Sequence, residues 1–243
     1  VVTATCRYRR RAGVAAGSAL RLDGEALETL GVELDGSPLD PSRWRVAGDT
    51  LVIDEPPEDF LLRTTVAIRP AGNLQLSGLY ASTAMLLTQC EAQGFRRITW
   101  FQDRPDVMST YRVVLRADAS RYPVLLSNGN LIASGADGPD AGRVRAVWVD
   151  PFPKPCYLFA LVAGRLEVNE ARYRTRSGRD VLLQVWVEPG QVARTDHAMQ
   201  SLKRAIGWDE RRFDLELDLD RFMIVATSDF NMGAMENKGL NIF

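Results

Sequence analysis

Histidine is scarce in this sequence: His197 is the only one among 243 residues. A catalytic zinc site with two imidazole ligands therefore cannot be assembled from this sequence alone. The sequence also contains no C-x-x-C pair. We therefore expect these residues to contain no metal site, no bound cofactor and no metal-dependent catalytic residue of their own.

Long apolar runs and an excess of one charge are also missing. The longest apolar run, Tyr157–Ala163, has the length of a strand, whereas a membrane span needs about 18–20 residues. The first residues lack an apolar segment after their charges, which predicts no signal peptide.

The 30 Lys and Arg are balanced by 31 Asp and Glu, for a net charge of -1. We expect neither a nucleic-acid nor a membrane partner, and Arg7–Arg11 is interpreted as a solvated edge strand.

Cysteine occurs only three times, as Cys6, Cys90 and Cys156. An odd number of widely separated cysteines fits a reducing compartment better than a disulfide framework, so we expect a cytoplasmic location. A catalytic cysteine needs a base such as histidine beside it. The sequence offers no plausible histidine partner for Cys90, so we do not expect it to act as a nucleophile. His197 itself is expected on the surface of a helix.

Most of the chain has the pattern of a β protein. Period-2 alternation in Thr64–Ile68, Tyr111–Arg116 and Arg143–Trp148 is typical of half-buried antiparallel strands. The pairs Asp35-Gly36 and Asn128-Gly129 predict tight hairpin turns, because both residue types tolerate positive φ. The sequence predicts a mainly β fold, with a β-sandwich or saddle of sheets in its N-terminal domain.

A boundary is expected near Gly164, which divides the chain into residues 1–164 and 165–243. The prolines of Pro151–Pro155 predict an extended loop, because proline lacks the N–H that a central strand needs. An apolar strand over Tyr157–Val162 is expected to follow this loop. We expect the first part to be β-rich throughout.

After residue 164 the pattern predicts a β-α-β arrangement. Val181–Val187 alternates as a strand, and Asp214–Asp220 alternates as another. Between them, Thr195 or Asp196 is a candidate helix cap, and Gly207 is a candidate helix end. The apolar face of this helix has the spacing i, i+4, i+7 and i+8, at Ala198, Leu202, Ala205 and Ile206.

The end of the chain carries the most specific motif. The run Asp229-Phe230-Asn231-Met232-Gly233-Ala234-Met235-Glu236-Asn237-Lys238-Gly239 resembles the substrate-anchoring strand of zinc aminopeptidases of the aminopeptidase N type. The segment Thr88-Gln89-Cys90-Glu91-Ala92 resembles one that the β-rich domain of bacterial cytosolic members contributes to the amine site, and Pro151–Ala160 resembles the end of that domain. From about Gly78 to Phe243 the chain thus resembles the N-terminal part of a bacterial alanyl aminopeptidase.

The resemblance implies a fold and an activity. The family places its zinc on an H-E-x-x-H helix, a gluzincin motif that would lie beyond Phe243. The β-rich domain 1–164 would precede the start of a thermolysin-like catalytic domain, 165–243. In the full-length enzyme, zinc would polarise the scissile carbonyl and activate water, a glutamate would act as general base, and a downstream tyrosine would steady the intermediate. The chain alone would anchor substrate and be inactive. Its partners would be peptides with a free N-terminus and the remaining domains of its own polypeptide.

The resemblance also implies roles for individual residues. Glu91 and Glu236 would hold the substrate's α-ammonium group, with their carboxylates converging in one pocket, and a cis peptide bond would follow Glu91. The remaining substrate-binding candidates would align the peptide or line the pocket: Gly233, Ala234, Met232, Gln89, Met235 and Asn237. Met232 would cushion the first substrate side chain, whereas Met235 has packing beneath the strand as its alternative.

Other interpretations stay open on the residues alone. Glu91 is then an unremarkable loop glutamate, and Glu236 an exposed residue at a strand end or in a turn. A non-catalytic scaffold or peptide-binding relative would keep the anchor segment without an intact metal site. A free-standing β-sandwich binding module would place Glu91 and Glu236 far apart.

Overall fold

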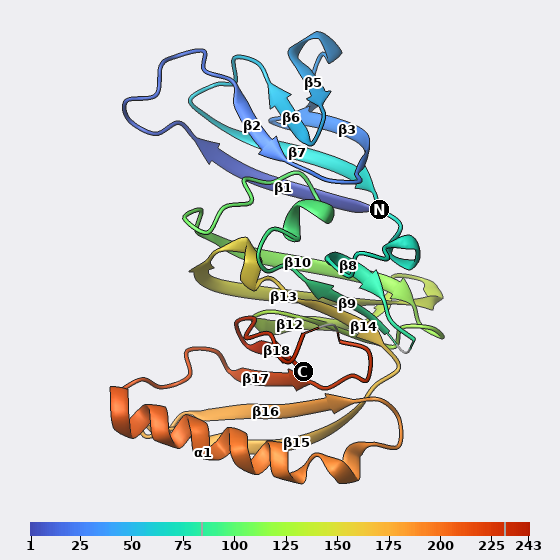
Figure 1. Ribbon diagram of the computed structural model, residues 1–243, viewed down its shortest axis with the longest axis vertical. Helices are drawn as coiled ribbons and strands as arrows, with labels where there is room; N and C mark the ends of the chain where they lie inside the picture. The colour runs from blue at the N-terminus through green and yellow to red at the C-terminus, as the bar shows by residue number, and fades with distance from the viewer. Residues whose placement is uncertain (84, 231) are drawn as a thin grey trace. The chain divides into compact units, whose positions relative to one another are not determined.

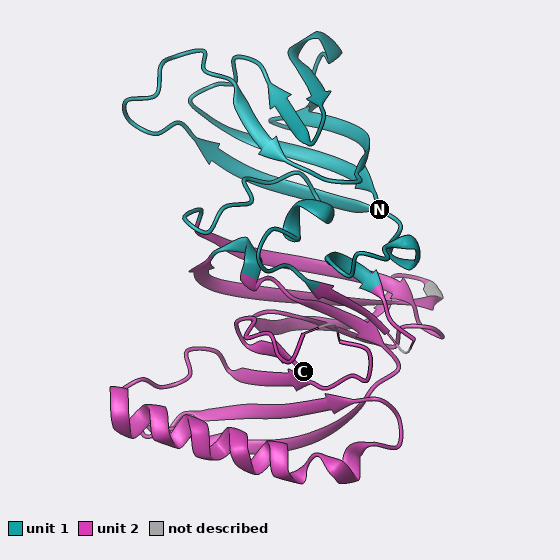
Figure 2. Ribbon diagram, in the orientation of Figure 1, with its two compact units in different colours: residues 1–80, 89–107, 155–157 teal, residues 81–88, 108–154, 158–243 magenta. Residues whose placement is uncertain are grey.

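The computed structural model describes residues 1–83, 85–230 and 232–243, so Asn231 of the anchor motif lies outside the described residues. The chain forms two compact units (Figure 2). Unit 1 comprises residues 1–80, 89–107 and 155–157, and unit 2 comprises residues 81–88, 108–154 and 158–243. Both are built mostly of strands (Figure 1), which confirms the mainly β prediction. The division into domains at residue 164 stays a prediction.

Unit 1 contains two antiparallel sheets, with strand orders β1-β7-β3-β4 and β2-β6-β5. β1 is an edge strand, and its Arg7 and Arg9 pair with Asp59. The solvated edge strand predicted over Arg7–Arg11 is therefore confirmed as far as Arg9, whereas Arg10 and Arg11 lie beyond the strand. The strands are β1 Val2–Arg9, β2 Leu20–Asp23, β3 Glu28–Leu34, β4 Ser37–Pro38, β5 Trp44–Ala47, β6 Thr50–Ile53 and β7 Asp59–Ala67, followed by β8 Gly78–Ala81. Short 3-10 helices occupy Pro41–Arg43, Pro70–Gly72 and Phe95–Arg97.

The core of unit 1 lies between these sheets. Leu22 and Leu51 from one sheet join Leu62 and Val66 from the other in one buried apolar cluster. The β3–β4 hairpin turns at Asp35-Gly36, where φ is 50° and 83°. Two consecutive positive φ angles are what a two-residue type I′ turn requires, so this predicted turn is confirmed.

Unit 2 begins with a three-stranded sheet of order β10-β13-β12. In a further sheet β14 pairs with β11 and β9. The buried Trp148 of β13 donates its indole N–H to the Leu125 carbonyl of β11 at 3.0 Å, which joins the two sheets. The strands are β9 Met85–Gln89, β10 Ser109–Asp118, β11 Val124–Ser127, β12 Asn130–Asp137, β13 Asp140–Lys154 and β14 Leu161–Gly164.

The C-terminal part of unit 2 is a β-α-β arrangement, as predicted. Its sheet has the order β15-β16-β17-β18, in which β16, β17 and β18 run parallel. Helix α1 lies along this sheet (Figure 1), and its Leu202 and Ile206 share a buried apolar cluster with Leu183 of β16. The elements are β15 Glu167–Arg174, β16 Asp180–Val187, α1 Asp196–Phe213, β17 Arg221–Val225 and β18 Leu240–Ile242, with 3-10 helices at Cys156–Leu158 and Val192–Arg194.

The predicted hairpin at Asn128-Gly129 is wrong. β11 before it pairs with β14, whereas β12 after it pairs with β13, so the turn passes the chain from one sheet to another. Gly129 has φ 92°, and a Cβ there would lie 2.3 Å from the Val149 carbonyl oxygen. Glycine is therefore needed for a close approach between backbones as well as for the turn.

Two predictions around α1 are also wrong. The helix continues through Gly207 to Phe213. Gly207 lies at a close packing position instead of a helix end, since an added Cβ would lie 3.2 Å from Arg211 Nη1 and 3.3 Å from the Tyr173 hydroxyl. The alternating segment Asp214–Asp220 is a connection, and the strand begins only at Arg221. Its acidic side chains bind separate partners: Glu216, for example, accepts hydrogen bonds from the backbone N–H and the hydroxyl of Ser177.

The proline-rich segment differs from the predicted loop. Pro151 and Pro153 lie within β13, where four residue steps from Asp150 to Lys154 oppose only two on β10. Prolines are tolerated in such an irregular stretch because it lacks regular ladder bonds. The buried ion pair of Lys154 Nζ with Asp150 Oδ2, at 2.9 Å, spans the bulge. Burial lowers the pKa of Lys154 to about 8, although Asp150 opposes the shift.

The predicted apolar strand over Tyr157–Val162 is only partly correct. Its first residues belong to the 3-10 helix Cys156–Leu158, and the strand β14 begins at Leu161. The buried Asn128 side chain accepts a hydrogen bond from the Ala160 backbone N–H at 2.7 Å. This side-chain contact takes the place of a ladder bond just before β14, so the strand begins later than the apolar run.

We predict that Gly129→Ala destabilises the protein by about 2–4 kcal/mol, because it combines positive-φ strain with a backbone clash. Gly190→Ala is the matched control: φ is 81°, but an added Cβ meets nothing within 4 Å. The control should cost only about 1–2 kcal/mol. Chemical denaturation measures both, and equal losses would contradict the importance of the close approach.

Candidate functional site

The last part of the anchor motif belongs to a closed loop of unit 2, Met235–Ile242, instead of the expected strand. Met235 N–H donates to the Ile242 carbonyl at 2.8 Å, and Ile242 N–H donates back to the Met235 carbonyl at 3.0 Å. Within the loop, Leu240 N–H donates to the Asn237 carbonyl at 3.0 Å, and Gly239 has φ 70°. This is the pattern of a type II turn, which needs positive φ at its third residue.

Burial alternates along this loop. Met235 and Asn237 are each 1% exposed, whereas Ala234 and Glu236 are exposed. Gly233 has open space on its Cα, since an added Cβ would meet nothing within 4 Å. The loop therefore presents the Glu236 carboxylate and the Gly233-Ala234 backbone outward while its neighbours hold it to the unit.

The two methionines of the motif occupy different environments. Met235 is packed in the interior, which agrees with the alternative of a side chain beneath the backbone. Met232 is 46% exposed and is free to contact a ligand. The substrate-binding roles of both residues, and that of Asn237, stay predictions.

Side chains at both ends hold the loop in place. Asp229 Oδ2 accepts the Thr83 backbone N–H at 2.9 Å, and the backbone and hydroxyl donors of Thr83 lower the pKa of Asp229. At the other end, Lys238 Nζ lies 2.6 Å from Asp218 Oδ2 and 4.9 Å from the centre of the Phe152 ring. The loop thus has a defined position within unit 2.

The Glu91 segment belongs to unit 1. Glu91 is exposed, and the peptide bond between Glu91 and Ala92 is cis, as the resemblance implies. Gln89 Nε2 donates to the Glu91 carbonyl at 3.3 Å, and Gly94 N–H donates to the Cys90 carbonyl at 2.8 Å. Gln89 therefore contacts the backbone of the turn that carries Glu91, while its role in substrate binding stays a prediction.

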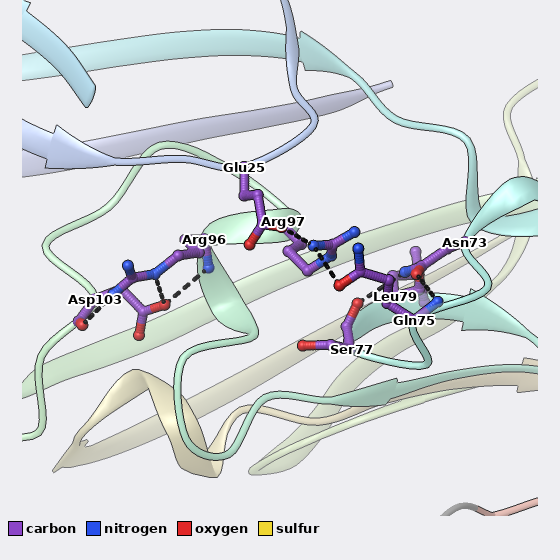
Figure 3. Close-up of polar contacts among 8 residues, drawn as sticks. All are labelled: Glu25, Asn73, Gln75, Ser77, Leu79, Arg96, Arg97 and Asp103. Atoms are coloured by element: carbon purple, nitrogen blue, oxygen red, sulfur yellow. Dashed lines mark hydrogen bonds and ion pairs between the residues drawn. The ribbon is translucent and has the colours of Figure 1, made fainter. Parts of the chain in front are cut away.

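Polar contacts fix the chain after this turn. Arg96 Nε lies 2.9 Å from Asp103 Oδ2, while Arg97 pairs with Glu25 and donates to Gln75 Oε1 at 3.3 Å (Figure 3). Asp103 is almost fully buried, so its carboxylate requires these donors. The contacts connect the segment that follows Glu91 to distant parts of unit 1.

Asn73 extends this set of contacts. Its Nδ2 donates to the Ser77 carbonyl at 2.7 Å and to the Leu79 carbonyl at 3.0 Å, and Figure 3 shows these residues beside Gln75. The connection before β8 is thereby ordered by a side-chain amide. It supports the segment that meets Arg97 through Gln75.

Cys90 does not have the properties of a nucleophile. Its thiol is fully buried, and burial raises its pKa, so the reactive thiolate is disfavoured. Cys156 donates its thiol to Asp103 Oδ1 at 3.0 Å, and burial likewise raises its pKa. All three cysteines are free.

The described residues do not fit a zinc site. No group of three or more His, Cys, Asp or Glu side chains in residues 1–83, 85–230 and 232–243 is arranged to hold a metal ion. His197 is exposed on α1, as predicted. A groove of about 1030 Å³ lies beside α1 in unit 2, and none of the eight substrate-binding candidates lines it.

Sequence reasoning missed the contribution of Asn128 to the candidate site. Its side chain is almost fully buried, and its Nδ2 donates to the Lys238 carbonyl at 2.9 Å. The Asn-Gly pair indicated only a turn, and nothing local to residue 128 points to a partner at residue 238. Asp229 belongs to the recognised motif, but its contact with Thr83 was equally invisible in the sequence.

Comparisons with known proteins agree with this arrangement. The Peptidase M1 N-terminal domain matches residues 51–158, and the Peptidase family M1 domain matches residues 197–243. The chain belongs to peptidase family M1. It is 53% identical over 242 residues to Aminopeptidase N of Caulobacter vibrioides and 50% identical over 243 residues to Aminopeptidase N of Escherichia coli.

These family M1 relatives are much longer. The alignments cover 100% of this chain but only 28% and 27% of the two bacterial relatives. The crystal structure of Legionella pneumophila aminopeptidase A in complex with aspartic acid matches with a TM-score of 0.92 and 35% identity, over 99% of this chain and 28% of that one. No helix in the described part of the chain is long and apolar enough to cross a membrane.

We predict that Met235→Ala costs about 2–5 kcal/mol of unfolding free energy, because it leaves a cavity in a packed interior. Met232→Ala, in the same loop but exposed, should cost less than about 0.5 kcal/mol. Thermal and chemical denaturation of the two variants measure this difference. Similar losses from both would show that the loop does not distinguish an inner from an outer face.

Proposed function

We propose that the complete gene product is a zinc-dependent aminopeptidase that removes N-terminal residues from peptides, and that this chain recognises the free N-terminus. The observation that most supports this proposal is the exposed Glu236 carboxylate on a loop closed by the Met235–Ile242 pair. Membership of family M1 and the similarity to bacterial enzymes named Aminopeptidase N support the proposal.

The chemistry of an α-ammonium group suits this loop. A charge-assisted hydrogen bond to a carboxylate contributes about 1.5–3 kcal/mol, which is enough to select a free terminus. The exposed backbone at Gly233 and Ala234 offers room for a peptide to pair beside it as an added strand. Met232 would then contact the first substrate side chain through its adaptable thioether.

Glu91 is the second proposed ammonium ligand. It is exposed in unit 1, whereas Glu236 belongs to unit 2, so their convergence on one ammonium group stays a proposal. Two carboxylates close together would repel each other in the empty site, and a bound cation would relieve that repulsion. Gln89 would act by holding the Glu91 carbonyl.

The metal chemistry is assigned to polypeptide outside this chain, because the described residues do not fit zinc. We therefore propose that the 243 residues alone are inactive. The three free thiols support a reducing, cytoplasmic location. A role in peptide catabolism would follow from the proposed activity.

We expect the complete gene product to hydrolyse alanyl-p-nitroanilide, to lose this activity on treatment with a zinc chelator, and to regain it when zinc is restored. The 243-residue chain should be silent under the same conditions. Hydrolysis by the chain alone would contradict the assignment of the chemistry to the rest of the gene product. Silence of the zinc-loaded complete product would favour a non-catalytic scaffold.

We predict that Glu236→Gln raises KM about 10- to 150-fold in the complete gene product, which corresponds to the loss of one charge-assisted hydrogen bond. Glu58→Gln, at another exposed glutamate, is the control and should leave KM unchanged. A double-mutant cycle with Glu91→Gln should give a coupling energy above about 0.5 kcal/mol if both carboxylates contact one ammonium group. Additive effects would contradict convergence.

A further inference from the structure

We propose that Asn128 is a positioning residue for Glu236, which it serves by fixing the turn that follows that glutamate. The inference rests on the proposed function for its kinetic consequences, but its structural basis is independent. Asn128 is 1% exposed and uses both amide hydrogens and its carbonyl oxygen in hydrogen bonds within unit 2.

The three bonds connect the loop to a strand region far away in the sequence. Nδ2 donates to the Leu158 carbonyl at 3.0 Å and to the Lys238 carbonyl at 2.9 Å, while Oδ1 accepts the Ala160 N–H at 2.7 Å. A buried amide with this many partners has one favourable orientation, because any rotation leaves polar groups unpaired. Asn128 therefore acts as a fixed point for the Lys238 carbonyl.

The Lys238 carbonyl belongs to the peptide group that defines the turn type. Asn237 to Leu240 forms the turn, and the peptide between Lys238 and Gly239 is its central one. Types I and II differ mainly in the orientation of this central peptide. The bond from Asn128 holds the type II orientation, in which Gly239 has positive φ.

The same turn borders Glu236 directly. Asn237 opens the turn, and Met235 is held by its pair with Ile242, so Glu236 lies between two fixed residues. On the far side, Met223 N–H donates to the Gly239 carbonyl at 3.0 Å. Release of the Lys238 carbonyl would free the central peptide of the turn that follows Glu236, which would then be held only by the backbone bonds of Asn237 and Gly239.

Two substitutions separate the roles of the Asn128 side chain. Asn128→Asp keeps the shape and the acceptor for Ala160 but replaces the donor with a carboxylate oxygen, which repels the two carbonyls. Asn128→Ala removes all three bonds. Ser127→Ala is the matched control: the neighbouring hydroxyl is also buried and donates to the Ala160 carbonyl at 2.8 Å, without a contact to the loop.

In the complete gene product, both Asn128 variants should raise KM for alanyl-p-nitroanilide at least about tenfold with a much smaller change in kcat. Ser127→Ala should leave KM within about twofold of the wild type. A uniform loss of kcat in all three variants, or the same KM in the Asn128 and Ser127 variants, would overturn the proposal.

Amide hydrogen exchange provides a readout that does not depend on activity. Peptides covering Glu236 to Leu240 should exchange at least about tenfold faster in the Asn128 variants, while β16 keeps its protection. Unchanged exchange in that turn would overturn the positioning role. If the wild-type gene product cleaves no peptide, the proposed function fails, and hydrogen exchange alone decides the role of Asn128.

If Asn128→Ala does not fold, the same measurements are made on the isosteric Asn128→Asp variant.

Discussion

The backbone pair between Met235 and Ile242 determines which side chains this loop exposes. Once the two hydrogen bonds close the loop, alternation along the backbone turns Met235 and Asn237 inward and Glu236 outward. The buried neighbours reduce the freedom of the exposed carboxylate. A recognition group held in this way loses little conformational entropy when it binds, so more of its electrostatic attraction remains as affinity.

The loop depends on the rest of unit 2 for this geometry. Parallel pairing of β17 with β18 holds its C-terminal side, and Asp229 binds Thr83 at its start. Asn128 holds the turn between them. The loop is therefore held by segments that are far apart in the sequence, and under the proposed function these segments would contribute to recognition of the substrate.

The sequence predicted the elements whose patterns arise from local geometry. Tyr111–Arg116 and Val181–Val187 alternate because their strands have one buried face, and both strands are present. Asp214–Asp220 alternates equally well but is a connection, because alternation does not record whether a neighbouring strand is available for pairing. The motif identified Glu236, whereas Asn128 acts through tertiary hydrogen bonds that no local pattern records.

The most direct test is a crystal structure of the complete gene product with a bound amino acid. We expect the ligand's ammonium nitrogen to lie within about 3.2 Å of carboxylate oxygens of both Glu236 and Glu91. We also expect that the Lys238 carbonyl still accepts its hydrogen bond from Asn128. An ammonium group bound away from Glu236, with that side chain in solvent, would contradict the central claim.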